Sequence, residues 1–252
     1  MADPSQPDGV PEVTFVDVNL RGARFVRSDL SGAVMRAVDV AGADIDAPWL
    51  LDGESVLRVN GVDVAPFVEA ELNRRFPGRA GRRAADPDDL RAAWAVVEHA
   101  WAATLERVAR MPAGTVEVTV DGEWSFAHTL RHLVMATDTW LGGAILGTEQ
   151  PYHPIGQPNV EYGTDGHDLS VFTTVAPAWT EVLEVRAGRV AMVRDLLATV
   201  TPDDLAAARR NPWSPEFPET TLSCLHTILE EEWGHLRYAV RDLAAIEAEL
   251  DV

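Results

Sequence analysis

A carboxylate and an imidazole lie four positions apart near the C-terminal end of the chain, at Glu231 and His235. On an α-helix, side chains at positions i and i+4 project from the same face. Glu231 and His235 would therefore form one half of a metal site. The other half requires a donor from a different element, and the best candidate is His132.

Two histidines and one carboxylate are a three-ligand set for Zn²⁺, or for Ni²⁺ or another divalent first-row metal, and they leave a position open for water or substrate. In helix bundles, such sites lie where the apolar faces of neighbouring helices meet. On helical wheels, His132, Glu231 and His235 all fall at the edge of an apolar face. The alternative interpretation is that the histidines are hydrogen-bonded residues at the edge of the core and the glutamates form a solvated face.

Two neighbouring residues compete for places in this ligand set. Glu232 lies nearer the centre of the apolar face than Glu231. Because a buried carboxylate needs a partner, Glu232 is either the ligand itself or a group that orients His235. His128 precedes His132 by four positions, so these two histidines can also chelate as a pair. The side chain of His128 points further from the apolar face, which ranks it lower.

The composition excludes several classes of function. The chain has 252 residues, 46% of them hydrophobic, and a formal net charge of −19. This charge argues against nucleic acid and against an anionic membrane surface as partners, because both require a basic face. No apolar run reaches the roughly 18 residues of a membrane span, and the N-terminus lacks a signal-peptide pattern. We therefore expect a cytoplasmic protein.

The N-terminal region follows a five-residue pattern that neither helix nor strand has. After residues 1–12, which we expect to form a loose arm, a large apolar residue occupies every fifth position: Phe15, Leu20, Phe25, Leu30, Met35, Val40, Ile45 and Leu50. Mostly small or aliphatic residues lie two positions before each. Residues 13–50 thus resemble the pentapeptide-repeat family, whose fold is a right-handed square β-helix. Two coils are too few to stand alone, so this segment should dock on the rest of the chain.

The next stretch links this segment to the second half of the chain. Asn60-Gly61 between alternating apolar residues predicts a β-hairpin with a type I′ turn. Residues 66–76 have the pattern of a short helix, and residues 77–85 form a linker rich in Arg and Gly. We place the domain boundary there, between a segment covering residues 13–85 and a second domain covering residues 86–252.

Four long amphipathic helices are predicted in the second domain, which makes the protein mainly α with a four-helix bundle. Asp86 caps the first helix and Ser125 caps the second. The predicted spans are 87–110, 126–146, 177–199 and 219–250. Residues 116–120 alternate like a short strand, a helical turn starts at Thr201, and residues 212–218 form a proline-broken loop. The long connection 148–176 suits a lid, binding loop or crossover and would let the second and third helices run parallel.

Motifs in the second and fourth helices resemble the DinB-like superfamily, most closely an actinobacterial branch with a pentapeptide-like N-terminus. They are Trp124-Ser125-Phe126, Thr129-Leu130-Arg131-His132-Leu133, Trp140, Pro151-Tyr152-His153-Pro154, and Glu231-Glu232-Trp233 followed by His235, Tyr238, Arg241, Asp242 and Leu243. The resemblance implies an up-down-down-up bundle that binds a divalent metal through His132, Glu231 and His235. The chain departs from the family pattern at Glu231, where many members have histidine, and at His128, where an acidic residue is expected.

The same resemblance implies a metal-dependent enzyme. Characterised relatives include transferases and isomerases that use mycothiol or bacillithiol, so we expect an S-transferase that joins a mycothiol-type thiol to a small electrophile. An open metal site suits this chemistry because a cation stabilises a thiolate near neutral pH. The candidates for proton transfer are His128, Glu232 and Tyr238. Tyr152 and His153 are the candidates for contact with the electrophile.

Two other functions are compatible with these residues. A metal-dependent hydrolase or isomerase would keep the same ligands, and a hydrolase would act without added thiol. A non-catalytic binding protein would carry a vestigial site and use the repeat segment as a partner surface or as the interface of a homodimer. Fold alone does not decide between these functions. Two observations would decide between them: whether the purified protein retains metal, and whether His132→Ala changes its function.

Overall fold

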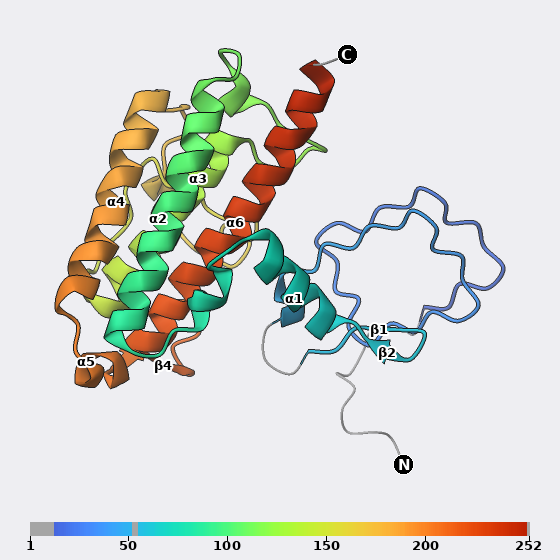
Figure 1. The fold of residues 1–252 in the computed structure, drawn as a ribbon, viewed down its shortest axis with the longest axis horizontal. Coiled ribbons are helices and arrows are strands. Elements are labelled where there is room, and N and C mark those ends of the chain that lie inside the picture. The colour runs from blue at the N-terminus through green and yellow to red at the C-terminus, as the bar shows by residue number, and fades with distance from the viewer. Residues whose placement is uncertain (1–12, 52–54, 251–252) are drawn as a thin grey trace. The chain divides into compact units, whose positions relative to one another are not determined.

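The computed structural model describes residues 13–51 and 55–250, which divide into two compact units (Figure 1). The first unit ends at Asp46 and the second begins at Ala47. The expected loose arm at residues 1–12 lies outside the described residues. We expected a boundary near residue 85, whereas the structure groups residues 47–85 with the helical unit.

The first unit repeats its backbone conformation every five residues. Left-handed φ angles recur at Asp17, Gly22, Arg27, Gly32, Ala37 and Gly42. Between these positions, the side chains of Asn19, Asp29 and Asp39 each accept a hydrogen bond from the backbone N–H two residues later, at 2.8–3.0 Å. The trace runs around in successive coils (Figure 1). The backbone of this segment therefore has the same five-residue period as its sequence.

The large apolar residues at the centres of these repeats stay accessible to solvent. Their exposed fractions range from 47% for Leu20 to 62% for Phe15 and Ile45. A solenoid buries its interior by stacking coil on coil, so a short run of coils leaves most of that interior uncovered. The first unit buries too little apolar surface to be stable by itself.

The second unit begins with short elements: the 3₁₀-helix η1 (Pro48–Leu51), the strands β1 (Arg58–Val59) and β2 (Val62–Asp63), and the helix α1 (Ala65–Arg75). The predicted hairpin is confirmed, because β1 pairs antiparallel with β2 across Asn60 and Gly61. Both turn residues have positive φ, 51° and 82°, as a type I′ turn requires. The short helix predicted at 66–76 is α1.

The segment expected to be a linker is instead a packed 3₁₀-helix, η2 (Arg79–Arg83). Arg79 and Arg82 are buried, and each donates a hydrogen bond of 2.9 Å to the carboxylate of Glu69 in α1. Burial opposes ionisation of Glu69, but the two arginines outweigh it and lower its pKa to about 2. Because η2 also packs against the later helices α2 and α6, this cluster joins residues 47–85 to the bundle.

The predicted four-helix bundle is confirmed. In the described residues it consists of α2 (Pro87–Ala109), α3 (Phe126–Thr137) continued by the π-helix η4 (Asp138–Ile145), α4 (Trp179–Thr199) and α6 (Thr221–Leu250). Figure 1 shows α2 and α6 running in one direction and α3 and α4 in the other, the up-down-down-up course. Both α2 and α3 pack against α4 and α6. The core between them includes Trp94, Val97, Trp101, Leu130, Leu133, Val182, Val193, Leu225, Leu229, Leu236 and Leu243.

The helix starts lie close to the positions that the capping residues predict. The Asp86 carboxylate accepts hydrogen bonds from two backbone N–H groups of the first turn of α2, both at 3.0 Å. Ser125 caps α3 in the same way. Thr201 and Asp204 form a reciprocal capping box at the start of α5 (Pro202–Ala206), where the sequence predicts a helical turn.

Shorter elements differ from the sequence-based expectation. The strand-like stretch after Pro112 contains the 3₁₀-helix η3 (Thr115–Glu117), and the long connection contains η5 (Leu169–Val171). The proline-broken loop closes a hairpin between β3 (Ala208–Arg210) and β4 (Pro218–Thr220), with Arg209 opposite Glu219. Strands of three residues are too short to show an alternating pattern, which is why the sequence does not reveal this hairpin.

Length alone does not allow a helix to cross a membrane. The helix α6 has 30 residues but carries charged residues from Glu230 to Glu249. Among residues 13–51 and 55–250, no helix combines the length and the apolar character that crossing a bilayer requires.

Candidate metal centre

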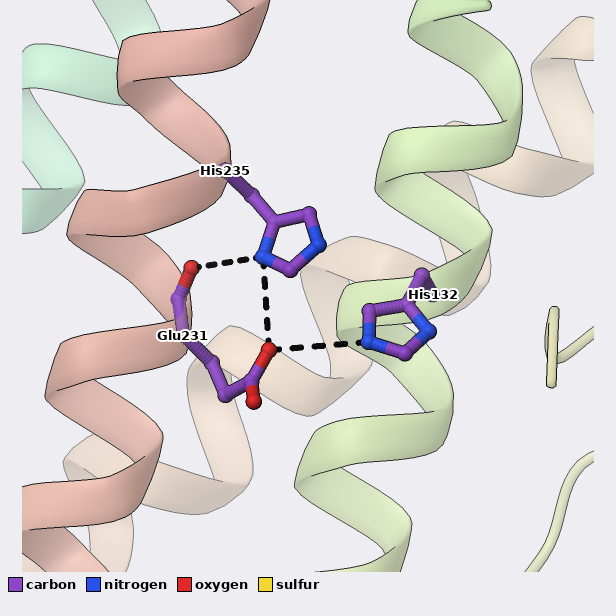
Figure 2. A group of neighbouring side chains, drawn as sticks. All are labelled: His132, Glu231 and His235. Carbon is purple, nitrogen blue, oxygen red and sulfur yellow. Dashed lines mark hydrogen bonds and ion pairs between the residues drawn. The ribbon is translucent and has the colours of Figure 1, made fainter. Parts of the chain in front are cut away.

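His132 of α3 lies opposite Glu231 and His235 of α6, and the carboxylate of Glu231 lies between the two imidazoles (Figure 2). The Oε2 atom of Glu231 is 3.5 Å from Nε2 of His132 and 3.3 Å from Nδ1 of His235. One ligand atom from each residue lies within 4.8 Å of the other two. In the described part of the chain, this is the group of His, Cys, Asp and Glu residues that could hold a metal ion.

The spacing of these atoms suits a small cation. In a tetrahedral zinc site with bonds of about 2.0–2.1 Å, neighbouring ligand atoms lie about 3.3 Å apart. The separation of 3.5 Å between Oε2 of Glu231 and Nε2 of His132 is close to this value. Nδ1 of His235 lies 2.9 Å from the backbone carbonyl of Glu231 and donates to it, so Nε2 is the atom that His235 would offer to a cation. The side chains of His132, His235 and Glu231 are 13%, 15% and 32% exposed, so the group is partly shielded from water but still accessible.

The orientation of His132 also favours a cation. Its Nδ1 atom is 2.9 Å from the backbone carbonyl of Gln157 and therefore carries the proton that this hydrogen bond needs. The Nε2 atom then presents a lone pair toward the carboxylate of Glu231. Two electron-pair donors that face each other repel unless a proton or a metal ion lies between them. A hydrogen bond from the other nitrogen to a carbonyl is the usual way in which proteins orient a histidine ligand.

Burial and mutual interaction give the residues the protonation states that metal ligands need. Burial opposes ionisation of Glu231, but the neighbouring side chains of His132 and His235 outweigh it and hold the pKa of Glu231 below the ordinary value. Burial lowers the pKa of His235 to about 4, and the attraction of Glu231 offsets only part of this effect. At neutral pH, Glu231 is therefore a carboxylate and His235 a neutral imidazole.

These pKa values predict that the metal-free protein loses stability as the pH falls from 6.5 to about 4. In this range the unfolded chain binds a proton at His235 that the folded chain does not bind, so the free energy of unfolding decreases. The full shift is worth on the order of 3 kcal/mol. Glu231 adds a further loss below its ordinary pKa of 4.5, because its folded pKa is also depressed.

Urea unfolding of EDTA-treated protein at a series of pH values measures this effect. The variant His235→Gln removes the titrating group and should show a shallower pH dependence than the wild type. Equal slopes in the two proteins would contradict the assignment to His235.

Glu232 lies in the bundle core and not among the three donors. Its side chain is 1% exposed, and both carboxylate oxygens are 2.5–2.6 Å from Nη2 of Arg186 in α4. Burial raises the pKa of Glu232, while the guanidinium of Arg186 acts in the opposite direction. The structure therefore gives Glu232 the partner that a buried carboxylate needs, and it brings Glu231 to the imidazoles instead.

His128 and Tyr238, the other candidates for proton transfer, have different surroundings. Nδ1 of His128 is 2.8 Å from the hydroxyl of Ser125, the residue that caps α3. Burial and the charge of Arg131 lower the pKa of His128. The structure does not bring His128 into the group of three donors. The ring of Tyr238, in contrast, meets the ring of His235 edge-on, with centroids 5.9 Å apart.

The connection between η4 and α4 reaches the site through its backbone. Tyr152, a candidate for contact with the electrophile, packs against Tyr162 and Phe172. The backbone N–H of His153, the second candidate, donates to the carboxylate of Asp138 at 2.8 Å. Both residues thus help to fold the connection itself. Its contact with the three donors is the carbonyl of Gln157, which accepts the hydrogen bond from His132.

Three residues that the structure places at the site have no role there assigned from the sequence, although Arg131 and Trp124 belong to the motifs of the family resemblance. Arg131 is buried and donates from Nε to the carbonyl of Ile155 at 2.7 Å, which holds the connection in place. Gln157 acts through its backbone, so no residue type could have indicated it. Trp124 lies against both imidazoles, and its position directly before the cap of the helix that carries His132 is the signal that could have found it.

Comparison with known proteins identifies both parts of the chain. Eight copies of the model for pentapeptide repeats match residues 15–46. The model of the DinB superfamily matches residues 96–239, which is more than half of the chain and contains all three donors. Neither the curated proteins nor the solved structures include a match. The DinB match supports a metal-binding, DinB-like protein. The chain, which carries pentapeptide repeats at its N-terminal end, therefore belongs to the DinB superfamily.

Proposed function

We propose that this protein is a metal-dependent enzyme that transfers a low-molecular-weight thiol of the mycothiol type to a small electrophile. One observation supports the proposal above all others. His132, Glu231 and His235 bring three donors of suitable type and spacing together at a partly accessible point. Three protein ligands leave one position of a tetrahedral cation for an exogenous ligand, as in catalytic zinc sites.

The residues around the donors prepare the site for this role. Gln157 fixes the ring orientation of His132, so that Nε2 faces the centre. Glu231 adds negative charge, and two imidazoles with one carboxylate favour Zn²⁺ or a similar divalent ion. When bound there, such a cation would stabilise a thiolate near neutral pH. Tyr238, in ring contact with His235, is the residue that we assign to proton transfer.

Removal of the metal should abolish the thiol transfer. We expect purified protein to contain about one divalent ion per chain and to catalyse arylation of a thiol by 1-chloro-2,4-dinitrobenzene, with release of chloride. Dialysis against a chelator should eliminate the rate above background, and addition of Zn²⁺ or Ni²⁺ should restore it. Elemental analysis and the absorbance of the thioether product are the measurements.

The controls separate the competing functions. Mycothiol, bacillithiol and glutathione, tested side by side, identify the preferred thiol. Turnover of an ester or amide substrate without thiol would assign the protein to the hydrolases instead. Stoichiometric metal without turnover of any tested substrate would favour a binding protein, and a wild-type protein that retains no metal would overturn the proposal.

A further inference from the structure

A short turn places an indole beside the three donors. Asp121 and Gly122 both have positive φ, 53° and 76°, and the N–H of Glu123 donates to the carbonyl of Val120 at 2.9 Å. This is a tight type I′-like turn. It reverses the chain directly before Ser125, so Trp124 enters at the N-terminus of the helix that carries His132.

The indole of Trp124 contacts both imidazoles. Its ring centroid is 4.7 Å from that of His132 and 6.2 Å from that of His235, to which it is nearly parallel with an interplanar angle of 21°. The two imidazole centroids are themselves 4.8 Å apart. The three rings therefore form one aromatic cluster, with the indole on one side of the two imidazoles. Because Trp124 is only half-buried, part of its surface remains available to a ligand.

The turn is also attached to the helix that carries the other two donors. Arg241 of α6 donates a hydrogen bond to the carboxylate of Glu123, the neighbour of Trp124, and lies over the ring of Tyr238. Tyr238 in turn contacts His235. The indole is therefore held at a defined place from both sides, by the start of α3 and by α6.

From this arrangement we infer that Trp124 is a specificity-determining residue of the metal centre. Its indole forms the apolar wall beside the open position and favours ligands that carry a planar ring next to the metal-binding atom. Offset stacking on an indole stabilises a planar group more than a saturated group of similar size. The inference rests on the proposed metal binding by His132, Glu231 and His235.

Cobalt-substituted protein tests the inference without an enzymatic assay. Phenylmethanethiol and cyclohexylmethanethiol have a similar size and a similar thiol group, but only the first has a planar ring. We expect the wild type to bind phenylmethanethiol about 2- to 10-fold more tightly, as read from the cobalt–thiolate absorption band. Trp124→Leu should abolish this preference, and Trp124→Phe should keep part of it.

A matched control uses a second tryptophan. Trp213 is 38% exposed and packs against Tyr162 and His167 of the connection between η4 and α4. Trp213→Leu should keep the wild-type preference. Binding of Co²⁺ should also quench tryptophan fluorescence, and Trp124→Phe should remove more of this quenching than Trp213→Phe does.

The outcomes distinguish this inference from the proposed function. If the wild type shows no cobalt spectrum, metal binding itself is overturned. If cobalt binds stoichiometrically but Trp124→Leu and Trp124→Phe both keep the wild-type preference, the role of Trp124 is overturned while the metal centre stands. Circular dichroism of each variant verifies that the fold is retained.

Discussion

His132→Ala should lower the affinity of the protein for Zn²⁺ by more than about 100-fold, because changes outside the ligand shell already cost about 10- to 100-fold. The variant removes the only donor that α3 contributes to the group. The remaining pair, Glu231 and His235, lies on one helix and cannot enclose a cation. Calorimetric titration of the metal-free protein with Zn²⁺ measures the affinity.

His128→Ala is the matched control for this experiment. It removes the same side chain from the same helix, one turn earlier, where the structure places it against Ser125. We expect this variant to bind Zn²⁺ as the wild type does and to show only a small change in stability. Wild-type affinity in His132→Ala, or a loss in His128→Ala that equals the loss in His132→Ala, would contradict the ligand set.

Breaking the buried ion pair should produce the largest effect on stability. Glu232→Ala leaves the guanidinium of Arg186, whose side chain is 6% exposed, without its carboxylate partner. Removal of one partner from a buried pair typically costs about 3–5 kcal/mol, because an uncompensated charge then remains in the core. Urea unfolding, monitored by circular dichroism, measures the change.

A double variant separates the cost of an unpaired charge from the loss of packing. Replacement of a whole buried pair by apolar residues of similar volume is often neutral for stability. We therefore expect Glu232→Leu combined with Arg186→Leu to be more stable than Glu232→Ala alone. If Glu232→Ala costs less than about 1 kcal/mol, the pair is more hydrated than the structure indicates.

Much of the fold follows from local sequence signals. The caps Asp86 and Ser125 mark the starts of two bundle helices, and Asn60-Gly61 marks a hairpin. Each of these signals depends on interactions within a few residues, so it is readable without knowledge of the fold. The five-residue repeat is equally local, because it reappears as left-handed φ angles at residues 17–42.

Features that depend on distant partners are not readable in this way. Residues 77–85 have the composition of a linker, yet Arg79 and Arg82 are buried because Glu69 of α1 neutralises them. The hairpin of β3 and β4 consists of strands too short to show a pattern. In both places the structure depends on contacts that the segment itself does not contain.

The candidate site shows the same division. The sequence by itself determined that Glu231 and His235 share a helix face, because helical periodicity relates these two positions. It indicated His132 as their partner through the place of this residue at the edge of the apolar face of another helix and through the family resemblance. Only the tertiary structure decided between Glu231 and Glu232. The two carboxylates are neighbours in the sequence, but α4 offers Arg186 to one and α3 offers His132 to the other. The tertiary structure also brought Trp124 and the carbonyl of Gln157 to the donors. Which charged or polar group lies across a helix interface is a property of packing, and helical periodicity carries no information about it.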